Sequence, residues 1–164
     1  MKKALLFVSF MIISICSFSQ TVNTAYGQTG KAPLNKGEKQ INFGLGLNTN
    51  GLPVYAQLDF AVSPDITVSP MFALTAGSSI SYASIGVHSD YHFNQLLDIP
   101  SNWDFYAGLN LGFRMFIGSR NGNSPLDLGL QVGGRYYWSR DWGVNLEFGG
   151  GAGFDSRVGV SKRF

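Results

Sequence analysis

Hydrophobic and polar residues alternate along most of this chain, which is the pattern of a β-strand with two chemically different faces. The clearest case is the segment 105–116, where Phe105 and Leu109 share one face and Tyr106 and Asn110 share the other. The alternation recurs and predicts strands at 41–48, 54–62, 66–75, 82–93, 105–116, 126–138, 142–149 and 157–164. No helical period of useful length follows residue 20, so the sequence predicts an all-β protein.

The spacing of these segments predicts a closed barrel. Each segment has roughly ten residues, which is close to the length that a tilted strand needs to cross a bilayer. Turn-forming residues separate the segments, for example at 63–65 and 139–141. Pro70 is a departure within its strand, because proline removes a ladder hydrogen bond. We therefore expect an eight-stranded antiparallel up-and-down barrel, the smallest whose interior side chains just fill it.

Either face of such a barrel could point inward, and the polar face distinguishes the two arrangements. A soluble barrel would turn its apolar face inward and would need many charged residues outside. Only 13% of the residues are charged, against about 25% in an average soluble domain. The polar face is also rich in glycine, which weakens an exposed strand but suits a narrow lumen. We therefore expect the apolar face to contact lipid in a transmembrane β-barrel, with a soluble secreted barrel as the alternative.

Aromatic residues crowd beside one set of predicted turns. Strand propensity alone does not explain this position, whereas an aromatic girdle at a membrane interface does. The residues concerned are Tyr91, Phe93, Trp103, Phe105, Tyr136, Trp138, Trp142 and Phe164.

The first residues have the features of a secretory signal peptide. Lys2 and Lys3 precede an apolar run that is shorter than the about 20 residues of a spanning helix. Cys16 is the only cysteine, which excludes a disulfide scaffold and leaves a lipoprotein leader as an alternative. The residues that follow are polar and aperiodic. The expected organisation is a signal peptide at 1–19, a flexible periplasmic arm at 20–37 and a barrel at 38–164.

The charge balance excludes one class of partner. Without Lys2 and Lys3, the 12 Lys and Arg residues become 10, which equals the 10 Asp and Glu residues. A nucleic-acid-binding protein would carry a basic patch, so we expect no nucleic-acid partner.

With these features, the chain resembles the small eight-stranded outer-membrane β-barrel proteins of Gram-negative bacteria, a porin-like group. The resemblance covers about residues 38–164. Family members end in a strand that the barrel-assembly machinery recognises, and Arg157, Gly159 and Phe164 match that assembly signal. Lys162 departs from it, because this position is usually hydrophobic. The end of the leader, Ser-Phe-Ser-Gln, is similar to leaders of Bacteroidetes-type bacteria.

The resemblance implies export to the cell outer membrane, with outer-membrane lipid and the barrel-assembly machinery as partners. It identifies no further protein partner. If both termini are periplasmic, as in that family, the outward loops are short, and a protruding adhesive surface is not expected. These loops would be 48–53, 76–79, 117–125 and 149–155.

Charged and histidine side chains on the polar face would lie inside the barrel. Isolated buried charges are costly, so we expect these groups to pair and to fill the lumen. We expect Arg114, Arg135 and Glu147 to form the central cluster. A gated pathway for small solutes is the alternative, because charged rings can tune selectivity. The polar lumen set is Asp59, His88, Asp90, His92, Arg114, Asp127, Arg135, Glu147, Arg157 and Arg163.

No residue pattern predicts a metal, a cofactor or catalysis. His88, Asp90 and His92 share one strand face, but neighbours at this spacing lie about 6.8 Å apart and do not easily chelate one ion alone. Lipid-modifying barrel enzymes need a Ser-His-acid arrangement near the outer leaflet, whereas His92 approaches the periplasmic end. The glycine-rich runs lack a P-loop lysine and a following helix. We therefore predict a structural or interaction protein, then a narrow solute channel, then a lipid-modifying enzyme.

Overall fold

The computed structural model describes residues 30–164 except for 32, 50, 78–80, 118–125 and 152–154. The predicted signal peptide and the arm residues 20–29 lie outside the described residues. The strands are β1 (Lys39–Leu47), β2 (Leu52–Ser63), β3 (Ile66–Ala76), β4 (Ser81–His92), β5 (Trp103–Ile117), β6 (Leu126–Tyr137), β7 (Trp142–Gly149) and β8 (Ser156–Arg163). Among the described residues, no helix has the length and hydrophobicity to span a bilayer.

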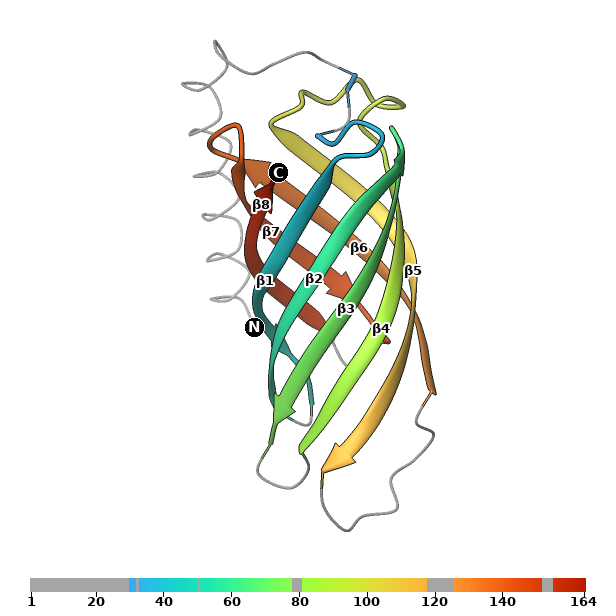
Figure 1. Cartoon of the computed structure of the whole chain (residues 1–164), viewed down its shortest axis with the longest axis vertical. Coiled ribbons are helices and arrows are strands. Elements are labelled where there is room, and N and C mark those ends of the chain that lie inside the picture. The colour runs from blue at the N-terminus through green and yellow to red at the C-terminus, as the bar shows by residue number, and fades with distance from the viewer. Residues whose placement is uncertain (1–29, 32, 50, 78–80, 118–125, 152–154) are drawn as a thin grey trace, which may run out of the picture.

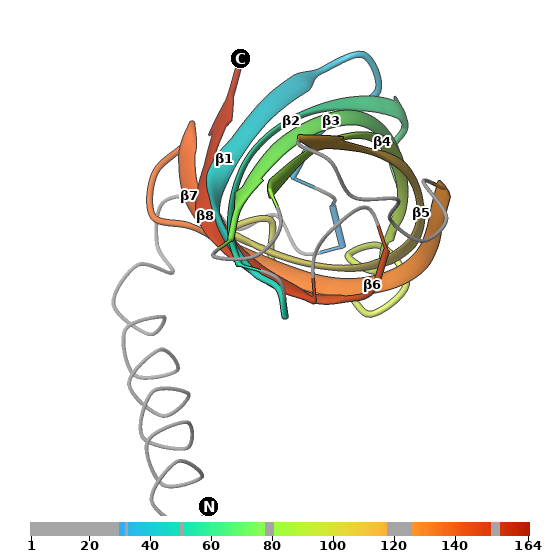
Figure 2. The same cartoon turned by 90° about the horizontal axis from the view of Figure 1, so that it is seen from below.

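The strands form one closed antiparallel barrel (Figure 1). Each strand pairs with the next in the sequence, and β8 returns to pair with β1. The closing register runs from Gln40 opposite Arg163 to Leu47 opposite Ser156. The view along the barrel shows the resulting ring (Figure 2). The predicted eight-stranded antiparallel barrel is confirmed.

Polar side chains line the inside of the barrel, and apolar side chains cover its outside. Asp59 and Gln40 are fully buried, whereas Leu128 and Leu130 are 74% and 68% exposed. The period-two alternation of the sequence therefore separates a polar core from an apolar surface. This is the reverse of a soluble barrel, and it is the arrangement that hydrocarbon around the barrel requires.

Two strands depart from the expected pattern. β5 begins at Trp103, so Asp104 lies within the strand and joins the inward face with Tyr106. Pro70 lies on the exposed face of β3. The β2–β3 pairing runs to Gln57 opposite Met71 and resumes only at Phe60 opposite Val68, which leaves a gap in the ladder beside the proline.

Two glycines make room for tyrosine rings that cross the lumen. A side chain at Gly133 would overlap the ring of Tyr106, and one at Gly159 would overlap the hydroxyl of Tyr55. Both tyrosines are buried and reach polar partners on other strands. The polar-face glycines at these two positions therefore act as lumen spacers, as the pattern predicted.

Aromatic rings cluster where the predicted girdle lies, at the barrel end that carries the C-terminus. The Trp103 ring lies 4.7 Å from the Tyr136 ring and 5.8 Å from the Phe105 ring, measured between ring centroids. The ammonium of Lys162 lies over the Trp142 ring, 5.2 Å from its centroid.

The residues just before β1 close over this same end of the barrel. Leu34 is only 4% exposed, the backbone N–H of Gly37 donates to the carbonyl of Ala61 at 2.8 Å, and Arg163 Nη1 donates to the carbonyl of Pro33 at 2.6 Å. The sequence led us to expect an arm without fixed contacts, and its last residues differ from that expectation. The difference arises because Leu34 is an apolar side chain that can be buried at the mouth of the barrel.

One carboxylate in this segment has a perturbed pKa. Partial burial raises the pKa of Glu38, but two hydrogen bonds from Asn35, together with the positive charges of Arg163 and Lys31, outweigh that effect and leave the pKa below its ordinary value. These bonds join Asn35 N to Glu38 Oε2 at 2.7 Å and Asn35 Nδ2 to Glu38 Oε1 at 2.8 Å. The ionised form of Glu38 therefore helps to hold the turn that leads into β1.

Candidate functional site

The lumen is the candidate site, because it collects the charged side chains that the sequence singled out. Most of them form two fully interior clusters and one ion pair near the end opposite the C-terminus, while Asp90 and Arg163 contact uncharged side chains. We call the first the Arg135 cluster, which consists of Asp59, His92, Asp104 and Arg135. We call the second the Arg157 cluster, which consists of His88, Glu147 and Arg157.

Arg135 is the hub of the first cluster. Its guanidinium pairs with Asp59 Oδ2 at 2.9 Å and with Asp104 Oδ2 at 3.1 Å, and it lies 4.4 Å from the centroid of the Tyr106 ring. The Arg135 side chain is 2% exposed, and those of both carboxylates are 0% exposed. One cation thus pairs with two carboxylates away from water, and removal of the arginine would leave both without this partner.

Amide side chains complete the solvation of Asp59. Gln40 Nε2 and Asn42 Nδ2 donate to Asp59 Oδ2 at 3.0 and 2.9 Å, and Gln57 Nε2 donates to Oδ1 at 2.7 Å. Because β1 and β2 are adjacent, their inward faces bring these donors together. The amides therefore supply the hydrogen bonds that a buried carboxylate needs.

His92 connects Asp104 to a hydroxyl. Its Nδ1 lies 2.7 Å from Asp104 Oδ1, and its Nε2 lies 3.0 Å from Thr67 Oγ1. This acid–histidine–hydroxyl order is that of a nucleophile activated by a base. Thr67 is only 1% exposed, however, and Leu34 lies over the group, where the remaining space is too small for a water molecule.

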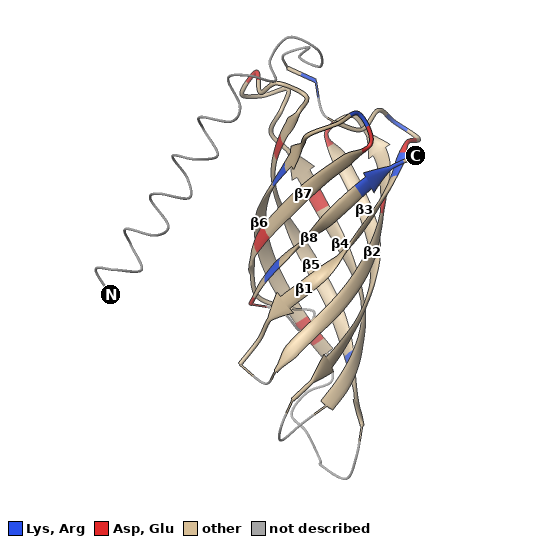
Figure 3. Cartoon of the chain, turned by 90° about the vertical axis from the view of Figure 1, so that its left-hand side faces the viewer, with Lys and Arg blue, Asp and Glu red and all other residues tan. Residues whose placement is uncertain are grey.

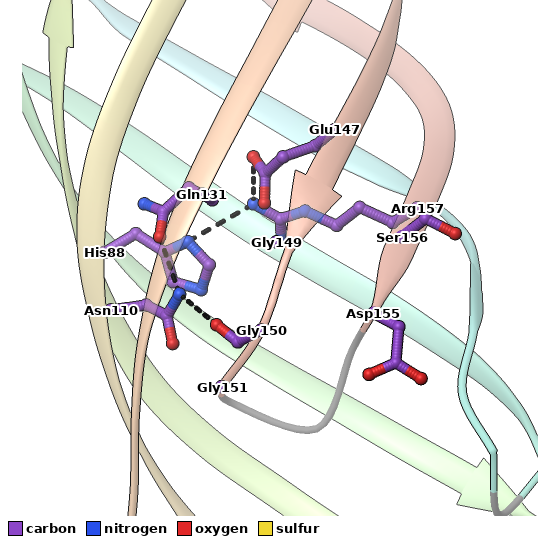
Figure 4. Close-up of a pocket in the computed structure, with 10 residues that line it drawn as sticks. All are labelled: His88, Asn110, Gln131, Glu147, Gly149, Gly150, Gly151, Asp155, Ser156 and Arg157. Atoms are coloured by element: carbon purple, nitrogen blue, oxygen red, sulfur yellow. Dashed lines mark hydrogen bonds and ion pairs between the residues drawn. The ribbon is translucent and has the colours of Figure 1, made fainter.

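The Arg157 cluster lies further along the lumen (Figure 4). Arg157 Nη2 pairs with Glu147 Oε2 at 2.7 Å and lies 3.3 Å from His88 Nδ1, and the hydroxyl of Tyr106 donates to Glu147 at 3.0 Å. Figure 4 shows Arg157 between His88 and Glu147. The cavity beside them is about 10 Å³, which is room for about one water molecule.

The remaining charged side chains lie apart from these clusters. Arg114 pairs with Asp127, and their side chains are 25% and 21% exposed. Asp90 Oδ1 accepts a hydrogen bond from Gln131 Nε2 at 2.7 Å. The guanidinium of Arg163 lies 3.9 Å from the centroid of the Tyr137 ring, at the end that carries the C-terminus.

The expected central cluster of Arg114, Arg135 and Glu147 is wrong, because the three belong to three separate ion-pair groups and Arg114 lies far from the other two. Arg135 and Glu147 are linked only through Tyr106, which contacts both. Arg135 faces Asp104 across the β5–β6 register. Arg114 lies ten residues further along β5 than Asp104, which is about 33 Å along a strand. A shared strand face therefore does not bring side chains together, because their heights along the barrel differ.

Sequence reasoning missed Asp104 and the role of the amides. The signal for Asp104 was present, because it lies two residues before Tyr106 and so on the same face. His88 and His92 take separate partners, in the Arg157 cluster and the Arg135 cluster. In the described part of the chain, no group of three or more His, Cys, Asp and Glu side chains could hold a metal ion.

Comparison with known proteins identifies the fold. No protein-family model and no curated protein sequence matches the chain. The N-terminal β-barrel domain of Pseudomonas aeruginosa OprF is similar in structure, with a TM-score of 0.66, 13% sequence identity, and coverage of 80% of this chain and 100% of that one.

Two designed proteins are also similar in structure. A barrel from the de novo design of transmembrane β-barrels has a TM-score of 0.60 at 15% identity, and the match covers 80% of this chain and 98% of the designed chain. The designed protein TMB2.3 has a TM-score of 0.55 at 18% identity, and the match covers 79% of this chain and 96% of the designed chain. Taken with the polar lumen and apolar exterior, these likenesses show that the chain has the fold of an eight-stranded transmembrane β-barrel.

Proposed function

We propose that this chain is an integral outer-membrane protein of a Gram-negative bacterium, with a structural or interaction role and a lumen closed by its own side chains. The observation that carries the proposal is the inverted barrel, with ion pairs inside and leucines such as Leu128 and Leu130 outside. Only a lipid environment stabilises such an exterior around a closed set of strands.

In this proposal both termini face the periplasm. The aromatic band then lies where the periplasmic face of the outer membrane meets water. The position of Lys162 supports placing this end at a membrane–water interface, because its stem can lie along the apolar surface while the ammonium reaches water beside Trp142. Of the expected assembly signal, Arg157 faces the lumen, Gly159 lies against Tyr55, and Phe164 is 67% exposed at the strand end. Outer-membrane lipid and the barrel-assembly machinery are the partners proposed.

The closed lumen distinguishes this proposal from a narrow solute channel. Arg135 reaches across the lumen from β6 to Asp59 on β2. Arg157 pairs with Glu147 on the neighbouring β7 and extends across the lumen to His88 on β4, and both ion pairs are buried. We expect no single-channel conductance when the refolded protein is reconstituted in a planar lipid bilayer. Discrete conductance steps from protein whose insertion has been verified would favour the channel instead.

We further propose that the protein is not an enzyme. The Asp104–His92–Thr67 chain has suitable hydrogen bonds, but the threonine is sealed beneath Leu34 and no substrate can reach it. The lipid A profile of cells should therefore be the same with the wild-type protein, with H92A and with the gene deleted. A profile that changes in both the deletion and H92A strains would contradict this.

A further inference from the structure

A second cavity lies at the end of the barrel that carries the C-terminus, outside both lumen clusters. Its volume is about 170 Å³, and Ser101, Asn102, Tyr137, Ser139, Arg140 and Arg163 line it. Two of these six residues are arginines and none is an acid. Both basic and acidic residues lie around this end of the barrel (Figure 3), but the acidic ones do not line this cavity. The cavity is therefore a small polar space with a positive lining.

One of the two arginines is held in place by its neighbours. The guanidinium of Arg163 lies 3.9 Å from the centroid of the Tyr137 ring, and its Nη1 donates to the carbonyl of Pro33 at 2.6 Å. Its Nε is buried and has no hydrogen-bond partner among the described residues. Because stacking fixes the plane of the guanidinium, little side-chain entropy remains to be lost when a ligand binds.

The lining also contains a buried amide without a partner. Asn102 is 5% exposed, and its Oδ1 meets no donor in the part of the chain that the structure describes. Its backbone carbonyl is occupied by the N–H of Tyr137, at 2.8 Å. Water does not reach this oxygen, so it lies behind the cavity wall, and Asn102 contributes an uncharged polar surface to the lining.

We propose that this cavity binds a small oxyanion, either a phosphate or the carboxylate of a peptide end. Arg163 and Arg140 would hold the anionic oxygens through charge-assisted hydrogen bonds. A volume of about 170 Å³ equals that of about six waters at about 30 Å³ each, which suits a group of this size.

The neighbouring space constrains what else the ligand carries. A wider cavity of about 470 Å³ shares Arg140 and Arg163 with the first, but Glu38 and Asp141 also line it. These carboxylates would repel a second anionic group. The anionic end of the ligand therefore belongs in the smaller cavity, and any remainder that extends into the wider one is neutral or positive. This inference goes beyond the proposed membrane role and does not depend on it.

The test is a titration of the refolded full barrel in detergent, followed by NMR or calorimetry, with inorganic phosphate and N-acetylalanine as probes. R163Q and R140Q remove one positive charge each, and N102D places a negative charge at the amide without changing its shape. K36Q is the matched control, because Lys36 is an exposed cation at the same end that lines neither cavity.

We expect R163Q, R140Q and N102D each to weaken binding of the preferred probe by at least about tenfold, and K36Q by less than about threefold. Tighter binding of phosphate identifies a phosphate-bearing solute, and tighter binding of N-acetylalanine identifies a peptide end. Failure of both probes to bind at about 10 mM would overturn the proposal. So would equal weakening by K36Q, or equally tight binding of N-acetylalaninamide, which has no carboxylate. A heat-dependent gel shift of each variant verifies that its barrel has formed.

Discussion

Replacement of Arg135 by methionine tests whether ion pairs stabilise the lumen as the structure indicates. Methionine keeps much of the side-chain volume and removes the charge. Asp59 and Asp104, both 0% exposed, then lose their shared cation. Breaking a buried ion pair by removing one partner costs about 3–5 kcal/mol, because the other charge stays buried without compensation. We expect R135M to lower the free energy of unfolding by at least this amount.

The matched control is R114M, which breaks an ion pair whose side chains are 25% and 21% exposed. Water reaches this pair and weakens the attraction between its charges, so R114M should cost clearly less than R135M. Both are measured by urea unfolding in lipid vesicles, followed by tryptophan fluorescence. The triple variant D59N/D104N/R135M should recover part of the loss. A cost below about 1 kcal/mol for R135M, or an equal cost for R114M, would refute the reasoning.

Three further outcomes are expected. L109R places a cation on the outer face at the middle of β5, a position that contacts hydrocarbon, and should lower the free energy of unfolding in vesicles by about 2–4 kcal/mol. A change near zero would place Leu109 outside the membrane. G133A should cost about 1–3 kcal/mol by overlap with the Tyr106 ring, and Y106L in the same chain should relieve most of that cost; no relief would mean that the overlap is not the cause. The pKa of Glu38 is lowered in the folded state, so its contribution to stability is present above its unfolded pKa and is lost as pH falls through the folded value. Hydrogen exchange of the Gly37 amide should therefore become faster below about pH 4.5 than its intrinsic pH dependence predicts. E38Q should abolish this acceleration. The same acceleration in E38Q as in the wild type would contradict the role of Glu38.

The fold could be predicted from the sequence because strand alternation has a period of two and separates the faces without knowledge of contacts. Phe105 and Tyr106 fall on opposite faces in any antiparallel barrel. The direction of each face followed from the chemistry of the polar side, where glycines such as Gly133 leave room for a ring. These inferences use only the spacing of hydrophobic and polar residues within each strand, which can be seen directly in the sequence.

The site was less predictable because partners depend on height along the barrel. Asp104 meets Arg135 because the β5–β6 register places them opposite each other, and that register depends on how long each strand continues before its turn. The strand was predicted to start at Phe105, one residue too late to include Asp104. The order of side chains along a strand was known from the sequence, but the alignment of one strand against the next was not.

A closed barrel whose apolar face contacts lipid is the central feature proposed for this protein. Gel mobility of the membrane-fraction protein in SDS, with and without boiling, tests this claim most directly. A closed membrane barrel resists SDS until it is heated, because no strand edge is free to open. We predict that the protein is found in the membrane fraction and that its mobility changes on boiling. Protein in the soluble fraction with the same mobility before and after boiling would contradict the assignment of the two faces.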